Sequence, residues 1–114
     1  MLLTVKGNTF LNPWTQSDAI ALFQDAAQQT NKVVDGNLVA GAGYTMTCGY
    51  GGSLSPQPTP TSIVIKNNRW STVYYPLSGI FGPADGWIPA MTADSSCAWL
   101  NNAYYETGAP IPHP

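Results

Sequence analysis

The sequence predicts a mainly β fold of the α+β class. We expect a small antiparallel β-sandwich or barrel-like sheet built from hairpins, with one N-terminal amphipathic helix packed on it. Three observations lead to this prediction: short segments alternate apolar and polar residues, Asn and Gly mark tight turns between them, and one stretch has helical periodicity. The 114 residues have the length of one domain, residues 1–114.

The predicted helix follows a strand-like run at residues 2–5 and extends from Thr15 to about Thr30. Thr15 is a suitable N-cap, and Asp18 follows three residues later, as in a capping box. Steps of 100° gather the apolar side chains on one arc: Ala19, Ile20, Leu22, Phe23, Ala26 and Ala27. The opposite arc carries Ser17, Asp18, Gln24, Asp25 and Gln28. This pattern predicts a helix with one face on a sheet.

The next segments have the two-residue period of strands. Residues 32–34 and 37–39 flank Asp35-Gly36, a pair typical of a type I′ hairpin turn. Residues 41–52 alternate Gly or Thr with larger side chains, which predicts a strand with one buried face. The Pro-rich loop at residues 53–60 is expected to be stiff and extended.

The second half of the chain is predicted to contain the clearest hairpin, residues 61–75 turning at Asn67-Asn68. Residues 96–105 fit a short helix or a last strand equally well. The C-terminal tail at residues 108–114 holds three prolines and should be extended. No internal repeat of fixed period is apparent.

The composition excludes several classes of function. Charged residues make up only 9% of the chain, against roughly a quarter in an average domain. Four scattered basic residues are too few for a phosphate-binding patch, so nucleic-acid binding is not expected. The charge-free stretch at residues 36–65 is too interrupted by Gly and Pro to cross a membrane. The N-terminus has no signal-peptide pattern, which predicts synthesis in a cytoplasm.

No catalytic, cofactor-binding or metal-binding residues are predicted, and we do not expect an enzyme. The single histidine, His113, lies between two prolines at the chain end, where it is poorly placed for catalysis. Cys48 and Cys97 lack neighbouring metal ligands and are expected to be two buried thiols. A disulfide between them, worth about 4 kcal/mol, is the alternative. Most of the acids have ordinary roles at caps and turns, and Glu106 is left over.

The low charge favours a structural assembly protein, because a free protein normally relies on surface charge for solubility. The setting that we predict is a virus or bacteriophage particle, with the chain as a capsid decoration, head-fibre, vertex or tail protein. It is then a virion component made in the host cytoplasm. The expected partners are copies of itself in a homo-oligomer and other structural proteins of the particle.

The alternative function is a lectin-like β module that binds glycans through exposed Trp and Tyr, with Trp70, Trp87 and Trp99 as candidates for stacking on sugars. Aromatic and proline residues also mark the expected protein interfaces, because interfaces are enriched in aromatics and poor in charge. The interface candidates are Pro56, Pro58, Pro60, Tyr74, Tyr75, Trp87, Tyr104, Tyr105, Pro110 and Pro112.

Overall fold

The computed structural model describes residues 2–24, 26–48, 56, 58–85 and 97–114, with the backbone alone described at residue 97. The described strands form three parallel sheets. Sheet A has the order β1 (Leu3–Lys6), β4 (Thr30–Asp35), β7 (Thr61–Lys66), β10 (Cys97–Leu100). Sheet B has the order β2 (Thr9–Asn12), β5 (Leu38–Gly41), β8 (Arg69–Trp70), β11 (Ala103–Tyr104). Sheet C has the order β3 (Ile20–Leu22), β6 (Tyr44–Cys48), β9 (Gly82–Asp85).

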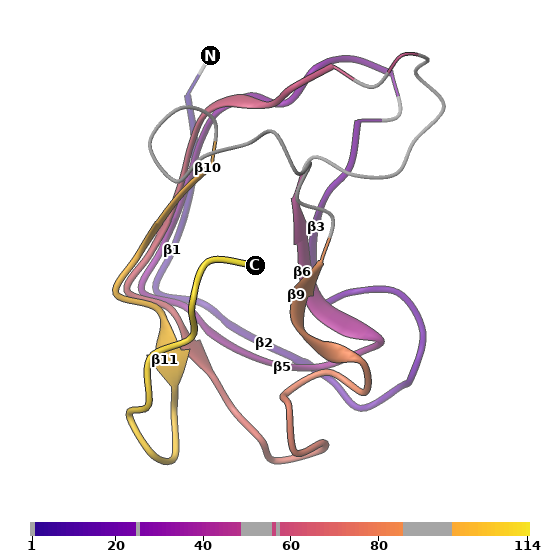
Figure 1. The fold of residues 1–114 in the computed structure, drawn as a ribbon, viewed down its shortest axis with the longest axis vertical. Coiled ribbons are helices and arrows are strands. Elements are labelled where there is room, and N and C mark those ends of the chain that lie inside the picture. The colour runs from indigo at the N-terminus through magenta and orange to yellow at the C-terminus, as the bar shows by residue number, and fades with distance from the viewer. Residues whose placement is uncertain (1, 25, 49–55, 57, 86–96) are drawn as a thin grey trace.

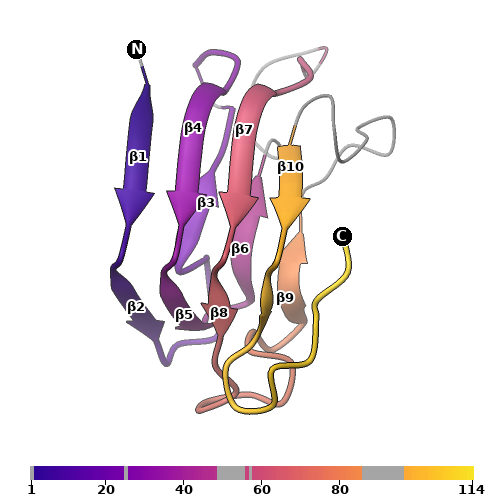
Figure 2. The ribbon, with the colours of Figure 1, turned by 90° about the vertical axis from the view of Figure 1, so that its left-hand side faces the viewer.

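The chain visits the three sheets in turn and so winds into a parallel β-helix. We call one circuit a rung: rung 1 holds β1–β3, rung 2 β4–β6, rung 3 β7–β9, and rung 4 β10 and β11. Figure 1 looks along the coil and shows the three sheets as the sides of a prism. Figure 2 shows sheet A in front, with β1 at one end and β10 at the other. Together the two views show a right-handed coil, the usual hand for connections between parallel strands.

The core consists of columns of inward-facing side chains that stack from rung to rung. In sheet A one column pairs Val5 with Val34, Ile65 and Trp99, and in sheet B one pairs Phe10 with Val39, Trp70 and Tyr104. Sheet C pairs Ile20 with Met46 and Ala84. All of these except Val5 belong to the hydrophobic core or pack against it. The rings of Trp70 and Trp99 lie 5.1 Å apart.

The predicted antiparallel sandwich with a helix is wrong, because every strand pair in the three sheets is parallel and the described residues contain no helix. The segment expected as a helix holds β3, in which Ile20 and Leu22 face inward while Ala21 is exposed. Gln24, expected on the polar face, is fully buried. A short apolar run fits either period, and pairing with β6 selects the strand.

The predicted hairpins at Asp35-Gly36 and Asn67-Asn68 are also wrong. The chain does not reverse direction at either pair. Instead, each pair lies at the corner where the chain passes from sheet A to sheet B. Gly36 and Asn67 have positive φ, 67° and 56°, but a type I′ turn requires positive φ at both central residues, and Asp35 and Asn68 lack it. The local backbone conformation was therefore predicted at one residue of each pair, and the relation between the flanking strands was not predicted.

An internal repeat is present, although it has no fixed period. The corner between sheets A and B carries Asn8, Asn37, Asn68 and Asn102, each preceded by a residue with positive φ. Successive members of this series are 29, 31 and 34 residues apart. Because the spacing grows along the chain, a search at fixed period does not detect it.

Of the two alternatives for residues 96–105, the strand is correct over the described part, as β10 and β11. Residues 61–66 and 44–48 also form strands, as predicted, within parallel sheets. Cys48 is buried, as expected, whereas the side chain of Cys97 lies outside the described residues. No helix of the described residues is long and apolar enough to cross a membrane.

Candidate interaction surfaces

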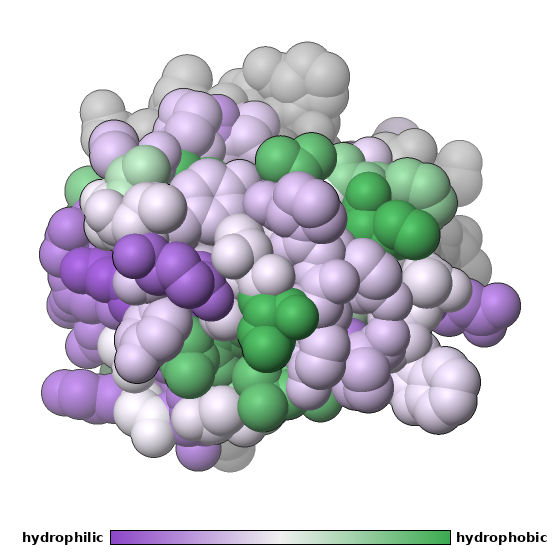
Figure 3. Space-filling model, turned by 90° about the horizontal axis from the view of Figure 1, so that it is seen from below, coloured by the Kyte–Doolittle hydropathy of each residue, from purple (hydrophilic) through white to green (hydrophobic). Residues whose placement is uncertain are grey.

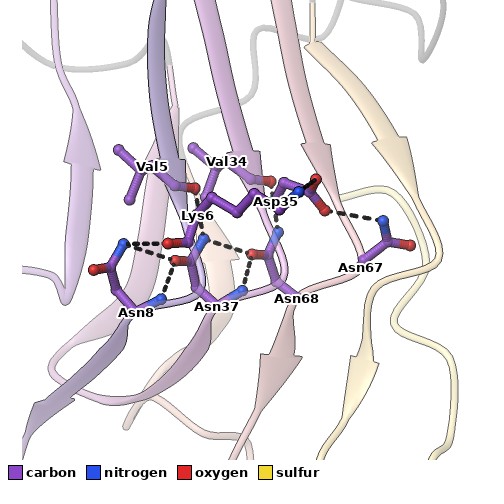
Figure 4. A network of polar contacts seen from close by, with 8 residues as sticks. All are labelled: Val5, Lys6, Asn8, Val34, Asp35, Asn37, Asn67 and Asn68. Atoms are coloured by element: carbon purple, nitrogen blue, oxygen red, sulfur yellow. Dashed lines mark hydrogen bonds and ion pairs between the residues drawn. The ribbon is translucent and has the colours of Figure 1, made fainter.

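The four asparagines at the corner form a ladder along the coil, and Figure 4 shows three of them: Asn8, Asn37 and Asn68. The side-chain oxygen of Asn68 accepts bonds from the backbone N–H and the Nδ2 of Asn37, at 2.9 and 3.0 Å. Its Nδ2 donates to the carbonyl of Val34 in the preceding rung and to Oδ1 of Asn102. Asn37, Asn68 and Asn102 are at most 2% exposed, so these bonds satisfy amides that water cannot reach.

The N-terminal end of the coil is open among the described residues. β1, β2 and β3 each pair with a strand on one side only. The inward columns begin with side chains that are only half-buried: Val5, Phe10 and Ile20. Their neighbours in rung 2 are at most 1% exposed: Val34, Val39 and Met46. Leu3, in line with the buried Ile63, is 48% exposed. We call this surface the open end.

The C-terminal end is closed by the chain's own tail. Ile111 is buried, its N–H donates to the carbonyl of Asn102 at 2.9 Å, and its carbonyl accepts from Nε1 of Trp99 at 2.7 Å. Tyr104 donates its N–H to Ala109 at 2.9 Å. The tail therefore covers the last rung by turning back and running antiparallel to β11, with Pro110 opposite Ala103 (Figure 2).

A second surface lies where the segments between sheets B and C meet. We call it the aromatic corner; it consists of Trp14, Tyr44, Tyr74, Tyr75 and Phe81. Trp14 and Phe81 are 76% and 66% exposed, and Tyr44 lies 5.8 Å from Phe81 between ring centroids. The hydroxyl of Tyr75 donates to the carbonyl of Pro13 at 2.6 Å, which joins rung 3 to the segment that carries Trp14.

Backbone hydrogen bonds hold this corner in place. Ala42 donates to Asn12 at 2.8 Å, Gly43 donates to Ser17 at 3.1 Å, and Phe81 donates to Gly43 at 2.9 Å. A side chain at position 41 would overlap the carbonyl of Asn12, so the close approach of the segments requires glycine there. The exposed rings are therefore carried by a backbone with fixed geometry.

The lateral face of sheet B and its following segment is weakly polar. Figure 3 shows green patches set in pale surface on this face, with strongly hydrophilic side chains gathered at one side. The segment after β8 exposes several large apolar side chains: Val73 (62%), Leu77 (50%), Ile80 (43%) and Phe81 (66%). We call these four residues the apolar lateral patch.

The structure separates the predicted interface residues. Tyr105, Pro56, Pro110 and Pro112 are exposed, Tyr74 is 37% exposed, and Tyr75 and Pro58 are half-buried. Tyr104 packs against the core and Pro60 is fully buried. Trp87 and half of the Pro-rich loop lie outside the described residues. Of the glycan candidates, Trp70 and Trp99 are core residues at 0% and 8% exposure.

Comparisons of the chain with protein-family models, with curated proteins and with solved structures found no match. The fold and its surfaces therefore rest on the chain's own geometry.

The described acids do not assemble a metal site, since no cluster of three potential ligands occurs among them. Burial raises the pKa of Asp18, and so does the nearby Asp85, while a hydrogen bond from Thr47 at 2.7 Å opposes the rise. At Glu106 burial acts in the same direction, but bonds from Ser71 and Thr72 outweigh it and lower the pKa. Glu106, left over in the sequence, thus anchors the segment after β8 to the C-terminal turn.

The ladder, Trp14 and Phe81 were not predicted from the sequence. The signal for the ladder was present: Gly7-Asn8, Gly36-Asn37, Asn67-Asn68 and Asn101-Asn102 are four similar pairs. Trp14 was not singled out because it lies next to the predicted start of a helix at Thr15. No sequence pattern distinguishes Phe81 from a core residue.

Proposed function

We propose that this chain is a structural assembly protein that acts through contacts with other proteins. The proposal is supported by two surfaces of the described residues, the open end and the apolar lateral patch. Both have few charged side chains that would oppose association with another protein. The partners are other structural proteins at the open end and copies of this chain at the lateral patch. The expected setting is a virus or bacteriophage particle.

The open end supports an assembly role because free strand edges invite pairing. Proteins usually protect such edges with charges, prolines or bulges. The strands of rung 1 contain no proline, and their one charged residue, Lys6, lies 3.9 Å from Asp35 in rung 2. An edge this poorly protected is expected to be covered in the working state.

Sedimentation velocity tests the proposal directly. We expect a mass above the 12.2 kDa of one chain at micromolar concentration. Val73→Lys, in the lateral patch, should lower this mass because it places a charge in the contact. Ala26→Lys adds the same charge at another exposed position and should leave the mass unchanged. A wild-type chain that remains a single copy would contradict self-assembly.

A second function, glycan binding, is favoured by the aromatic corner. Trp14 and Phe81 present exposed rings on a hydrogen-bonded backbone, and such rigid faces bind flat apolar surfaces at little entropic cost. The apolar face of a pyranose is a ligand of that kind. Polar groups of Asn12 and Ser17 lie on the same segment as Trp14.

A glycan array with matched variants tests this second function. Binding that is lost in Trp14→Ala and kept in Tyr105→Ala, another exposed aromatic, would support the aromatic corner. Absence of binding to any glycan, or equal loss in both variants, would exclude it as the site.

A further inference from the structure

We propose that the open end binds the last rung of a parallel β-coil supplied by a different polypeptide, and that the tail stops copies of this chain from stacking end to end. This inference rests on the proposed assembly function and specifies the partner at one of its surfaces. It follows from the direction of the asparagine ladder and from what occupies each end of the coil.

The ladder defines what the open end accepts. Asn37, Asn68 and Asn102 each donate Nδ2 to a carbonyl of the preceding rung, at 2.9–3.0 Å. Each also accepts, through Oδ1, the N–H of the asparagine one rung before. The ladder thus has one direction, and every member needs a parallel rung on its N-terminal side.

Asn8 occupies the same position without such a rung. Its Nδ2 donates instead to Lys6 in its own rung at 3.1 Å, and to Oδ1 of Asn37 at 3.3 Å. Among the described residues, no group donates to Oδ1 of Asn8. A parallel rung with a backbone N–H at this corner would supply the missing donor. Its carbonyl would accept from Nδ2.

The rung also needs apolar side chains on its inner face. Val5 and Phe10 begin columns that are buried in later rungs, so a partner must continue these columns over the open end. The partner is therefore a coil with an apolar interior and a turn between two parallel strands. A single extended peptide would cover only one of the three edges.

Copies of this chain do not present such a rung. The backbone carbonyl of each ladder asparagine accepts a hydrogen bond from the residue that follows the ladder asparagine of the next rung. Thus the N–H of Arg69 donates to the carbonyl of Asn37 at 2.8 Å, and the N–H of Ala103 donates to the carbonyl of Asn68 at 3.2 Å. At rung 4 this acceptor, Asn102, is already bonded to Ile111 of the tail. End-to-end stacking of copies therefore requires displacement of the tail.

Release of the tail in the 114-residue chain tests both parts of the proposal, because the last rung is then exposed and can bind the open end of another copy. Ile111→Asp places a charge where the side chain is now buried, and Ile111→Ser is a milder change. Pro112→Asp is the matched control, because it adds the charge at an exposed tail position. We expect the mass of both Ile111 variants to rise continuously with concentration, while the wild type and the control keep a defined mass.

A second substitution shows whether growth uses the open end. Gly7 donates to Asp35 and Val5 accepts from Asn37, so alternate residues of β1 bond to rung 2 and the N–H of Thr4 faces the free edge. Thr4→Pro removes this free donor, whereas Leu2→Pro lies just before the strand. Added to Ile111→Asp, Thr4→Pro should abolish growth and Leu2→Pro should not.

Three results would overturn the proposal. Growth that persists with Thr4→Pro would mean non-specific aggregation. A wild-type dimer that Thr4→Pro dissociates would mean that two open ends pair with each other. Loss of the folded coil in both Ile111 variants, seen in the near-ultraviolet circular dichroism of the Trp70–Trp99 pair, would make the tail part of the core. A wild-type monomer would contradict self-assembly at the lateral patch but would leave the expected growth of the Ile111 variants unchanged.

Discussion

At the residue scale, the asparagine ladder explains how a narrow coil turns its corner. The residue before each asparagine takes the left-handed conformation, which Gly and Asn adopt most readily. The asparagine amide then supplies both a donor and an acceptor to neighbouring rungs. A side chain with only one of these functions would leave a buried backbone group without a partner.

Asn68→Leu should lower the free energy of unfolding by about 3 kcal/mol, because the N–H of Asn37 and the carbonyl of Val34 lose their partner. The matched change is Asn67→Gly, at an exposed position with φ of 56°. It should cost about 1 kcal/mol or less, since only exposed bonds are lost. Urea unfolding of both variants provides the measurement, and equal losses would count against the ladder.

Asp18 predicts an unusual dependence of stability on pH. Because its pKa is raised in the folded protein, the folded state binds the proton more tightly than the unfolded state. Its ionisation therefore destabilises the fold as pH rises above the ordinary value of 3.8. Asp18→Asn, which keeps an acceptor for Thr47, should be more stable than the wild type at neutral pH.

This difference should vanish below pH 3.8, where the carboxyl is protonated in both states. Denaturant unfolding across this range, with wild type and variant side by side, gives the comparison. If Asp18→Asn is the less stable protein at neutral pH, the ionised carboxylate stabilises the fold and the sign is reversed.

At the scale of elements, the strands are short and depend on their neighbours in the next rung. β8 and β11 have two residues each, too few to be stable alone. The segments between sheets B and C are instead held by close backbone contacts at residues 41–43. Glycine at this corner therefore has a steric role in addition to a conformational one.

Gly41→Ala and Gly36→Ala separate these two roles. Both glycines have positive φ, 90° and 67°, but a Cβ at Gly36 meets no atom within 4 Å. Gly36→Ala should cost about 1 kcal/mol from backbone strain alone. Gly41→Ala should cost at least about 2 kcal/mol more, because its Cβ overlaps the backbone of Asn12. Thermal and urea unfolding would show the difference, and similar losses would argue against the contact.

The sequence predicted the position of several elements but not how they associate. The alternation at residues 61–66 and the positive φ at Gly36 follow from local preferences, which neighbouring residues reveal. Whether the chain reverses direction or turns a corner after a strand depends on pairing with a rung about 30 residues away. Local sequence patterns carry no information on that pairing. For the same reason Ile20 and Leu22 were assigned to a helix. Tyr105, an interface candidate, is exposed, whereas Trp14 was overlooked because exposure depends on the fold.

At the scale of the whole molecule, each rung contacts mainly the rungs before and after it. Stability in such a coil is close to a sum over neighbouring rungs, so opening begins at an unprotected end. The two ends differ here, because the tail covers rung 4 and, in the described residues, nothing covers rung 1.

Hydrogen exchange should therefore be fastest in β1 and β2 and slowest in β5 and β6, with β10 and β11 between them. Ile111→Ser should speed exchange in β10 and β11 and leave β1 unchanged, since it releases the tail alone. Exchange of individual peptides by mass spectrometry gives this profile. Uniform exchange along the coil would show that the molecule opens as one cooperative unit.

The unequal spacing of the ladder asparagines has a consequence for engineering. Circuits of 29, 31 and 34 residues all maintain the same stacking, and the link between sheets B and C is residues 42–43 in rung 2 but residues 71–81 in rung 3. Extra length is absorbed in the links, while the inward columns stay in register. The scaffold is therefore suited to carry grafted peptides, such as an epitope placed after the exposed Pro76 in the link of rung 3, on a backbone whose shape does not depend on the length of the insert.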